Sequence, residues 1–231
     1  MVKLDKQPSP ELQQPEKNSG CAKKFLIGVL ILLLPIIFFA MSGEELPDEH
    51  DSKFYSDRAL EHLKAAEYDA CIADADKAVE LDTQNDSAYY YRATAKNFLG
   101  QYAQAIQDFD KAVELDPTDY TYYNNRALAY GRTGDNVKAV ADFDKAIELN
   151  PDYAMAYNNR GTVYMNLEQY ERAIQDFDKA IELKPDAAEI YRNRALCYHK
   201  LGDTEKSRAD LDKSKEFSET SSEEDFGRTL R

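Results

Sequence analysis

The chain has 231 residues, of which 43% are hydrophobic and 31% are charged, which is enough for one folded domain with flanking segments. Its formal net charge of −14 argues against a nucleic-acid partner, because binding to phosphates requires a basic surface. The three cysteines, Cys21, Cys71 and Cys197, follow no metal-binding or redox spacing, so we expect neither a metal nor a cofactor.

The N-terminal part of the chain divides into a polar and an apolar segment. Residues 1–22 are rich in Pro, Gln, Asn and Ser and lack hydrophobic periodicity, which predicts a disordered tail. Two lysines then precede seventeen uncharged residues, Phe25 to Met41, in which Leu, Ile and Phe dominate. This pattern predicts one transmembrane helix within residues 23–42, near the short limit of what spans a bilayer.

The same lysines predict the orientation of this helix. Five lysines precede the apolar run and none lies in the eleven residues after it, so the positive-inside rule places the N-terminus in the cytoplasm. The rest of this single-pass membrane protein would then be non-cytoplasmic, and periplasmic if the source is a Gram-negative bacterium. Two alternatives stay open: cleavage of a signal peptide after Ala40-Met41-Ser42, or an inverted anchor with the remainder in the cytoplasm.

A repeat with a period of thirty-four residues occupies the chain from Ser52 to Phe217 and aligns without gaps. The acidic, Pro-containing residues 43–51 precede it and predict a solvated linker. The Ser- and Glu-rich residues 218–231 follow it and predict a disordered acidic tail. The five blocks of the repeat are 52–85, 86–119, 120–153, 154–187 and 188–217.

Several positions of the block are nearly constant when its first residue is counted as position 1. Position 4 is always Tyr, position 7 is always Arg, position 8 is Ala or Gly, and position 24 is Phe in the three inner blocks. These residues fall at helical spacing in two segments, with Gly at the break and Pro near the end of several blocks. The pattern predicts two helices per block and a continuous core between stacked blocks.

This pattern resembles the tetratricopeptide repeat (TPR), a helix–turn–helix unit of thirty-four residues. The resemblance implies an all-α, right-handed solenoid of antiparallel helix pairs, here behind one N-terminal transmembrane helix. The chain departs from the family pattern at position 4, where the family often has Trp, and at position 7, where it often has Leu. The outer blocks are also less regular, as expected of units that expose one face.

The resemblance further implies a concave groove for a partner, lined by positions 2, 5, 6, 9 and 12 of the first helices. A carboxamide both donates and accepts hydrogen bonds, so a row of Asn could pair with the backbone of an extended peptide. Alternatively, these Asn residues only help the helices to pack. The predicted partner-binding residues are Tyr90, Tyr91, Asn124, Asn125, Asn158, Asn159, Arg192 and Asn193.

The invariant Arg at position 7 could form either a basic ladder for anions or a set of structural ion pairs. Each block also has Asp at positions 23 and 25, so every guanidinium has candidate carboxylates on nearby helices. Repetition of the pair in every block favours structural inter-helix contacts, which are directional when bidentate. The predicted pairs join Arg58, Arg92, Arg126, Arg160 and Arg194 to Asp74, Asp108, Asp142, Asp176 and Asp210.

The remaining patterns bear on function. The clamp by which TPR co-chaperones hold the acidic C-terminal tails of heat-shock chaperones requires Asn at position 9 and basic residues at position 6, and neither occurs here. The histidines are far apart, and no glycine-rich phosphate loop is present. We therefore expect no enzyme but a membrane-anchored scaffold that binds a protein partner in its groove. The alternatives are a self-associating structural solenoid and an accessory subunit of a cell-envelope enzyme or secretion machine.

Overall fold

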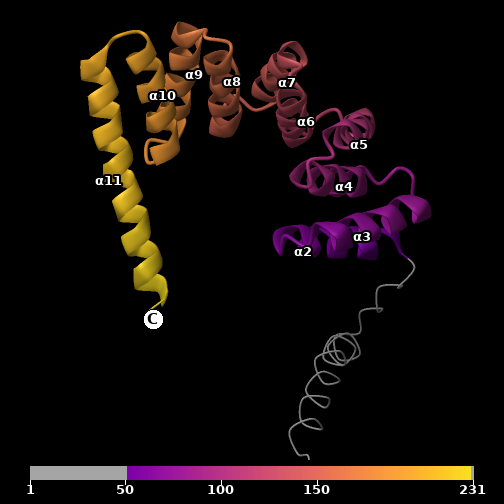
Figure 1. Ribbon diagram of the computed structural model, residues 1–231. Coiled ribbons are helices and arrows are strands. Elements are labelled where there is room, and N and C mark those ends of the chain that lie inside the picture. The colour runs from indigo at the N-terminus through magenta and orange to yellow at the C-terminus, as the bar shows by residue number, and fades with distance from the viewer. Residues whose placement is uncertain (1–50, 230–231) are drawn as a thin grey trace, which may run out of the picture. The chain divides into compact units, whose positions relative to one another are not determined.

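The computed structural model describes residues 51–229, with side chains up to Ser218 (Figure 1). Within this range every regular element is a helix, and two helices fall in each block of the repeat. The helices are α2 (Ser52–Lys64), α3 (Tyr68–Leu81), α4 (Asp86–Phe98), α5 (Tyr102–Leu115), α6 (Tyr120–Thr133), α7 (Asn136–Leu149), α8 (Ala154–Asn166), α9 (Tyr170–Leu183), α10 (Ala188–Lys200) and α11 (Thr204–Thr229).

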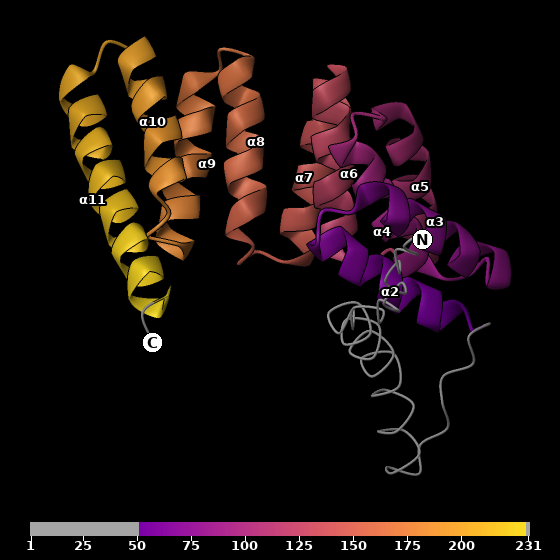
Figure 2. The ribbon, with the colours of Figure 1, turned by 60° about the horizontal axis from the view of Figure 1, so that its bottom comes forward.

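The two helices of each block pack against one another, and successive pairs stack in chain order (Figures 1 and 2). The second helix of each block contacts the first helix of the next block, as α3 does with α4 and α5 with α6. The first helices of neighbouring blocks also touch, from α2 with α4 through to α8 with α10. The described chain is therefore a solenoid of helix pairs, in which each unit relies on its neighbours for burial.

The core follows the small and large positions of the repeat. Phe143 at position 24 is fully buried in one cluster with Ala127, Ala139 and Val163. These three residues lie on α6, α7 and α8, and α8 belongs to the next block. Phe109 and Phe177 are buried in the same way. Close packing also explains Gly at position 8 of the fourth block, since a Cβ on Gly161 would lie 2.8 Å from the Phe177 ring.

The break between the two helices of a block requires a left-handed residue at position 15. Three blocks have Gly there, and Gly134 adopts a φ of 85° with the backbone N–H bonded to the end of α6. The other two blocks place Ala66 and Glu168 at this position, both with a φ of 59°. Gly removes the steric cost of this conformation, so we expect it to stabilise the three breaks that contain it.

Replacing Gly134 by Ala is expected to lower the free energy of unfolding by about 1 kcal/mol, because a Cβ is disfavoured at positive φ. The control is Gly131→Ala, three residues earlier inside α6, where a Cβ would also meet no atom within 4 Å. That change should raise the free energy of unfolding by about 0.5–1 kcal/mol through helix propensity. Urea titration measures both, and equal signs for the two variants would contradict the assignment.

The last helix differs from the sequence prediction. α11 continues to Thr229, whereas a disordered tail was predicted from residue 218. Glu219 stands at position 32, where Pro117, Pro151 and Pro185 follow the second helices of the inner blocks, so no proline stops α11 there.

The predicted tail 1–22, transmembrane helix 23–42 and nearly all of the linker 43–51 lie outside the described residues. Within residues 51–229, no helix is long and apolar enough to cross a membrane.

Candidate functional site

The arginine at position 7 binds the aspartate at position 23 of its own block. The contact is bidentate: Nε and Nη2 of Arg126 lie 2.7 Å and 2.8 Å from the two carboxylate oxygens of Asp142. The aspartates are buried, with exposed fractions of 5–8%. The same geometry joins Arg58 to Asp74, Arg92 to Asp108, Arg160 to Asp176 and Arg194 to Asp210.

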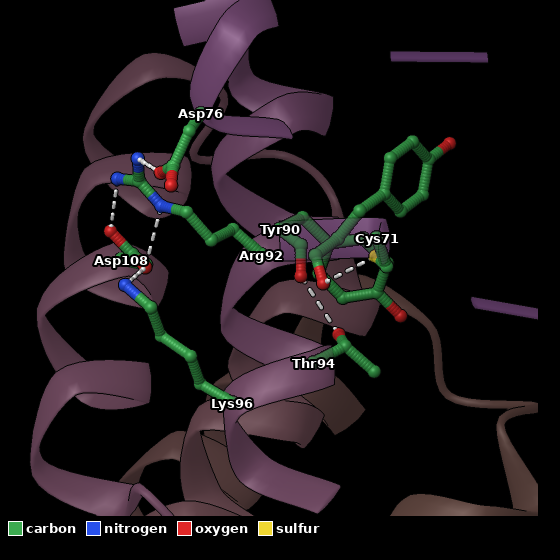
Figure 3. A network of polar contacts seen from close by, with 8 residues as sticks. Cys71, Asp76, Tyr90, Arg92, Thr94, Lys96 and Asp108 are labelled. Carbon is green, nitrogen blue, oxygen red and sulfur yellow. Dashed lines mark hydrogen bonds and ion pairs between the residues drawn. The ribbon is translucent and has the colours of Figure 1, made fainter. Parts of the chain in front are cut away.

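The third nitrogen of the guanidinium reaches the preceding block. Nη1 of Arg92 lies 2.7 Å from Asp76, which is at position 25 of the first block, and Lys96 also binds Asp108 (Figure 3). Equivalent bonds join Arg126 to Asp110, Arg160 to Asp144 and Arg194 to Asp178, at 2.9, 2.5 and 2.6 Å. Each of these arginines therefore bridges its own first helix to two second helices, one from each of two neighbouring blocks.

The environment of the arginines identifies their role. Burial disfavours the charged form of Arg126, but the hydrogen bonds to Asp142 and the charge of that carboxylate raise the pKa of the guanidinium above its ordinary value. The tyrosine at position 4 lies beside the same cation, with Tyr123 5.5 Å from Arg126 by ring centroid. Carboxylates and a ring thus occupy the guanidinium, which makes the row structural and leaves no anion-binding ladder.

The predicted row of asparagines forms a second chain of bonds between blocks. Asn159 donates from Nδ2 to Oδ1 of Asn124 at 3.1 Å, and Asn193 donates to Oδ1 of Asn158 at 3.3 Å. Asn125 donates to the hydroxyl oxygen of Tyr90 at 3.0 Å. In the third, fourth and fifth blocks, position 6 therefore binds position 5 of the preceding block. These hydrogen bonds hold neighbouring first helices together, as expected if the Asn residues help the helices to pack. They use the amide nitrogens at position 6, so the carboxamide oxygens at position 6 remain available as acceptors.

Burial separates the predicted groove residues into two kinds. Asn124 is only 1% exposed, so contrary to prediction it cannot touch a partner; its side chain instead orients Asn159. Tyr90 packs its ring against Tyr91 and Tyr122, at centroid distances of 5.6 and 4.9 Å, and is half-buried. The Thr94 hydroxyl donates to the carbonyl oxygen of Tyr90 within α4 (Figure 3). The Cys71 thiol of α3 donates to the carbonyl oxygen of Tyr91. The tyrosine pair is thus largely part of the packing.

Two hollows lie along the first helices, at positions 5, 6, 9 and 12 of the predicted groove. The central hollow has a volume of about 200 Å³ and is lined by α6, α7 and α8, with Leu128, Thr162 and Asn159 at positions 9 and 6. The C-terminal hollow has a volume of about 470 Å³ and is lined by α10 and α11, with Arg192, Asn193, Leu196, His199 and Leu211. We call the surface formed by positions 5, 6, 9 and 12 of the first helices, with these two hollows, the first-helix face.

The C-terminal hollow is lined by Leu211, which stands at position 24 of the last block. The rings of Phe109, Phe143 and Phe177 occupy this position in the inner blocks and are fully buried, whereas the Leu211 side chain is shorter and 50% exposed.

A further polar feature lies at position 12 of the second block. Asn97 Oδ1 is buried and has no hydrogen-bond partner among the described residues, so it is an acceptor for a donor from outside them.

The two cysteines in the described part of the chain are both buried. Burial raises the pKa of the Cys71 and Cys197 thiols to about 11, so both stay protonated near neutral pH and react slowly. Among residues 51–229, no cluster of His, Cys, Asp or Glu could hold a metal ion.

Stacked helix pairs with a hollowed first-helix face define a helical-repeat protein. Sequence profiles of the family described as tetratricopeptide repeat match residues 120–153, 154–187 and 177–209, and a further TPR repeat profile matches residues 99–134. The repeat region therefore belongs to the tetratricopeptide repeat family, as its sequence pattern indicates. No curated protein matches the sequence significantly.

Solved structures share the fold. A crystal structure of MamA superposes with a TM-score of 0.65 at 24% identity, over 71% of this chain and 96% of that one. MamA 41-end from Desulfovibrio magneticus RS-1 gives 0.67 at 18% identity, over 76% and 98%. YrrB, described as a TPR protein with an unusual peptide-binding site, gives 0.60 at 23% identity, over 74% and 88%. At these identities the likeness establishes the fold alone.

Proposed function

We propose that this protein is a non-catalytic scaffold that binds a segment of a partner protein on its first-helix face. The observation that carries the proposal is the pair of hollows at corresponding repeat positions, one between the third and fourth blocks and one in the fifth. Hollows that follow a repeat offer evenly arranged subsites, which suit a linear segment better than a small molecule. YrrB, which has the same fold, is described as having a peptide-binding site, and this supports a peptide segment as the ligand.

The residues of the first-helix face indicate what kind of partner segment it would bind. Leu196 and Leu211 are 44% and 50% exposed in the C-terminal hollow, which suits an apolar anchor side chain. Arg192 lies at the same hollow and is exposed, so a carboxylate next to that anchor would be favoured. The Asn193 and Asn159 amide nitrogens are bonded within the protein, whereas their oxygens remain acceptors for backbone N–H groups. An extended segment with free backbone N–H groups fits these contacts better than a helix.

The test places a photo-crosslinking amino acid at Thr162 or Leu196 in the full-length protein, expressed in the cells that produce it. We expect one discrete partner adduct from both positions. The control is Val137, which is 83% exposed on α7 and outside both hollows. Adding Arg192→Glu should reduce the adduct at least ten-fold, since loss of a hot-spot contact costs about 2 kcal/mol. An adduct of equal yield at Val137, or one containing only a second copy of this chain, would contradict the proposal.

The second part of the proposal is that residues 23–42 hold this scaffold at a membrane, with the repeats on the non-cytoplasmic side. It rests on the uncharged run Phe25 to Met41 and on the lysines before it. We expect the full-length chain to stay in the membrane pellet after carbonate extraction, and a tag after Arg231 to be digested in spheroplasts. A mature chain beginning at Gly43, or a protected tag, would refute the anchor or its orientation without affecting the binding face.

A further inference from the structure

An exposed aromatic ring stands at the helix break of the second block, where the repeat otherwise has a polar residue. Position 13 is Phe98, the last residue of α4, and it is 62% exposed. Its ring stacks on Tyr68 at the start of α3, with ring centroids 5.0 Å apart and an angle of 10° between the ring planes. In the other four blocks position 13 is Lys64, Arg132, Asn166 or Lys200.

The stacked rings border a hollow between the breaks of the first two blocks. This hollow has a volume of about 380 Å³, and Tyr68, Leu99 and Ala66 are among the residues that line it. Leu99 follows Phe98 in the chain and is 40% exposed. We call Tyr68, Phe98, Leu99 and this hollow the break-edge surface. It shares no residue with the first-helix face or with the two hollows of that face.

The hollow of the break-edge surface is acidic. Glu67 and Asp69 both line it. The Glu67 carboxylate is already bound, since its Oε2 lies 2.6 Å from Nδ1 of His62. Asp69 is exposed in the first turn of α3, and its carboxylate forms no hydrogen bond or ion pair with the described residues. A cation next to the apolar group that enters the hollow is therefore favoured.

We propose that the break-edge surface is a second docking site, which binds a partner segment with an apolar side chain followed by Lys or Arg. The apolar side chain enters the hollow against Tyr68 and Leu99, and the cation pairs with Asp69. Exposed aromatic residues beside a hollow are typical centres of protein–protein contacts. The site goes beyond the proposed function, because it selects a basic segment and lies apart from the first-helix face.

Charge distinguishes this partner from the other possible occupants. Exposed apolar side chains that stand alone are common, but here two stacked rings and a leucine border one hollow. A symmetric contact between two copies of this chain would bring Glu67 and Asp69 of one copy against those of the other, and like charges in contact oppose association. Anionic lipid headgroups are disfavoured for the same reason, and the net charge of −14 adds to both effects.

Peptide binding to the detergent-solubilised full-length protein tests the proposal. The probes are dye-labelled Gly-Ser peptides with blocked ends and with Leu-Lys, Leu-Glu or Ser-Lys at the centre, followed by fluorescence anisotropy. We expect the Leu-Lys peptide to bind most tightly and Phe98→Lys to weaken its binding about ten-fold. The fold accepts lysine at this position, as Lys64 and Lys200 show. Equal affinity for the three peptides, or an affinity that Phe98→Lys leaves unchanged, would overturn the proposal.

Further variants test the charge and the location. Asp69→Lys should reverse the preference, so that the Leu-Glu peptide binds about five-fold more tightly than the Leu-Lys peptide. Val137→Lys, on an 83% exposed residue outside the break-edge surface, controls for the added charge and should leave binding unchanged. Binding that Leu196→Lys weakens and Phe98→Lys does not would place the peptide on the first-helix face instead. Association between copies that Phe98→Lys removes would assign the surface to a second copy, and either result would refute the second site.

Discussion

Replacing Phe143 by Ala is expected to lower the free energy of unfolding by about 3–5 kcal/mol, because it removes a fully buried ring and leaves a cavity between blocks. The ring contacts both helices of the third block and Val163 of the fourth block. The cavity therefore weakens the packing within the third block and also its junction with the fourth block. In a solenoid, a weaker junction lets the blocks before it and the blocks after it unfold more independently. Urea unfolding followed by circular dichroism should show a lower midpoint and a broader transition.

The matched control for this change is Leu211→Ala, at the same position of the last block. Leu211 is 50% exposed and has no block beyond it within the described residues, so we expect a cost below about 1 kcal/mol. Both variants should be measured at low protein concentration, where association between copies contributes little. Similar costs at positions 143 and 211 would show that the ring at position 24 does not carry the junction.

The helix pairs could be predicted from sequence because their determinants are local and repeated. Small residues at positions 8 and 20, with a large apolar residue at position 24 in four of the blocks, specify which faces meet, and Gly at position 15 marks the break in three blocks. The extension of α11 was missed because the Ser- and Glu-rich composition after Phe217 suggested disorder. The missing proline at position 32 was no clear signal, since Thr83 also stands at position 32 and α3 still ends at Leu81.

The candidate site could be predicted only in part. The pairing of Arg with Asp at position 23 was predicted, whereas the second bond, to Asp at position 25 of the preceding block, is seen only in the structure. The burial of Asn124 and the hollow beside Leu211 depend on how side chains of different helices fill space. Such packing cannot be predicted from the pattern of a single sequence. Leu in place of Phe at position 24 does mark the last block, where the C-terminal hollow lies.

Replacing Arg160 by Leu is expected to lower the free energy of unfolding by about 2–4 kcal/mol, because it leaves the carboxylate of Asp176 buried without its bidentate partner. The same change removes the bond to Asp144 in the preceding block. Amide exchange should therefore rise in α8 and α9 and also at the junction with α7. The measurement is urea unfolding combined with hydrogen exchange of the full chain.

Two further variants separate the buried bond from the exposed one. Asp144→Asn changes only the exposed end of the bridge, where the carboxylate side chain is 55% exposed, and should cost less than about 1 kcal/mol. The double variant Arg160→Leu with Asp176→Leu removes both buried charges together and should recover to within about 1 kcal/mol of the original protein. If Arg160→Leu costs no more than Asp144→Asn, the guanidinium does not hold the helices. If the double variant is as unstable as the single one, the cost comes from lost packing of the arginine side chain rather than from the unpaired carboxylate.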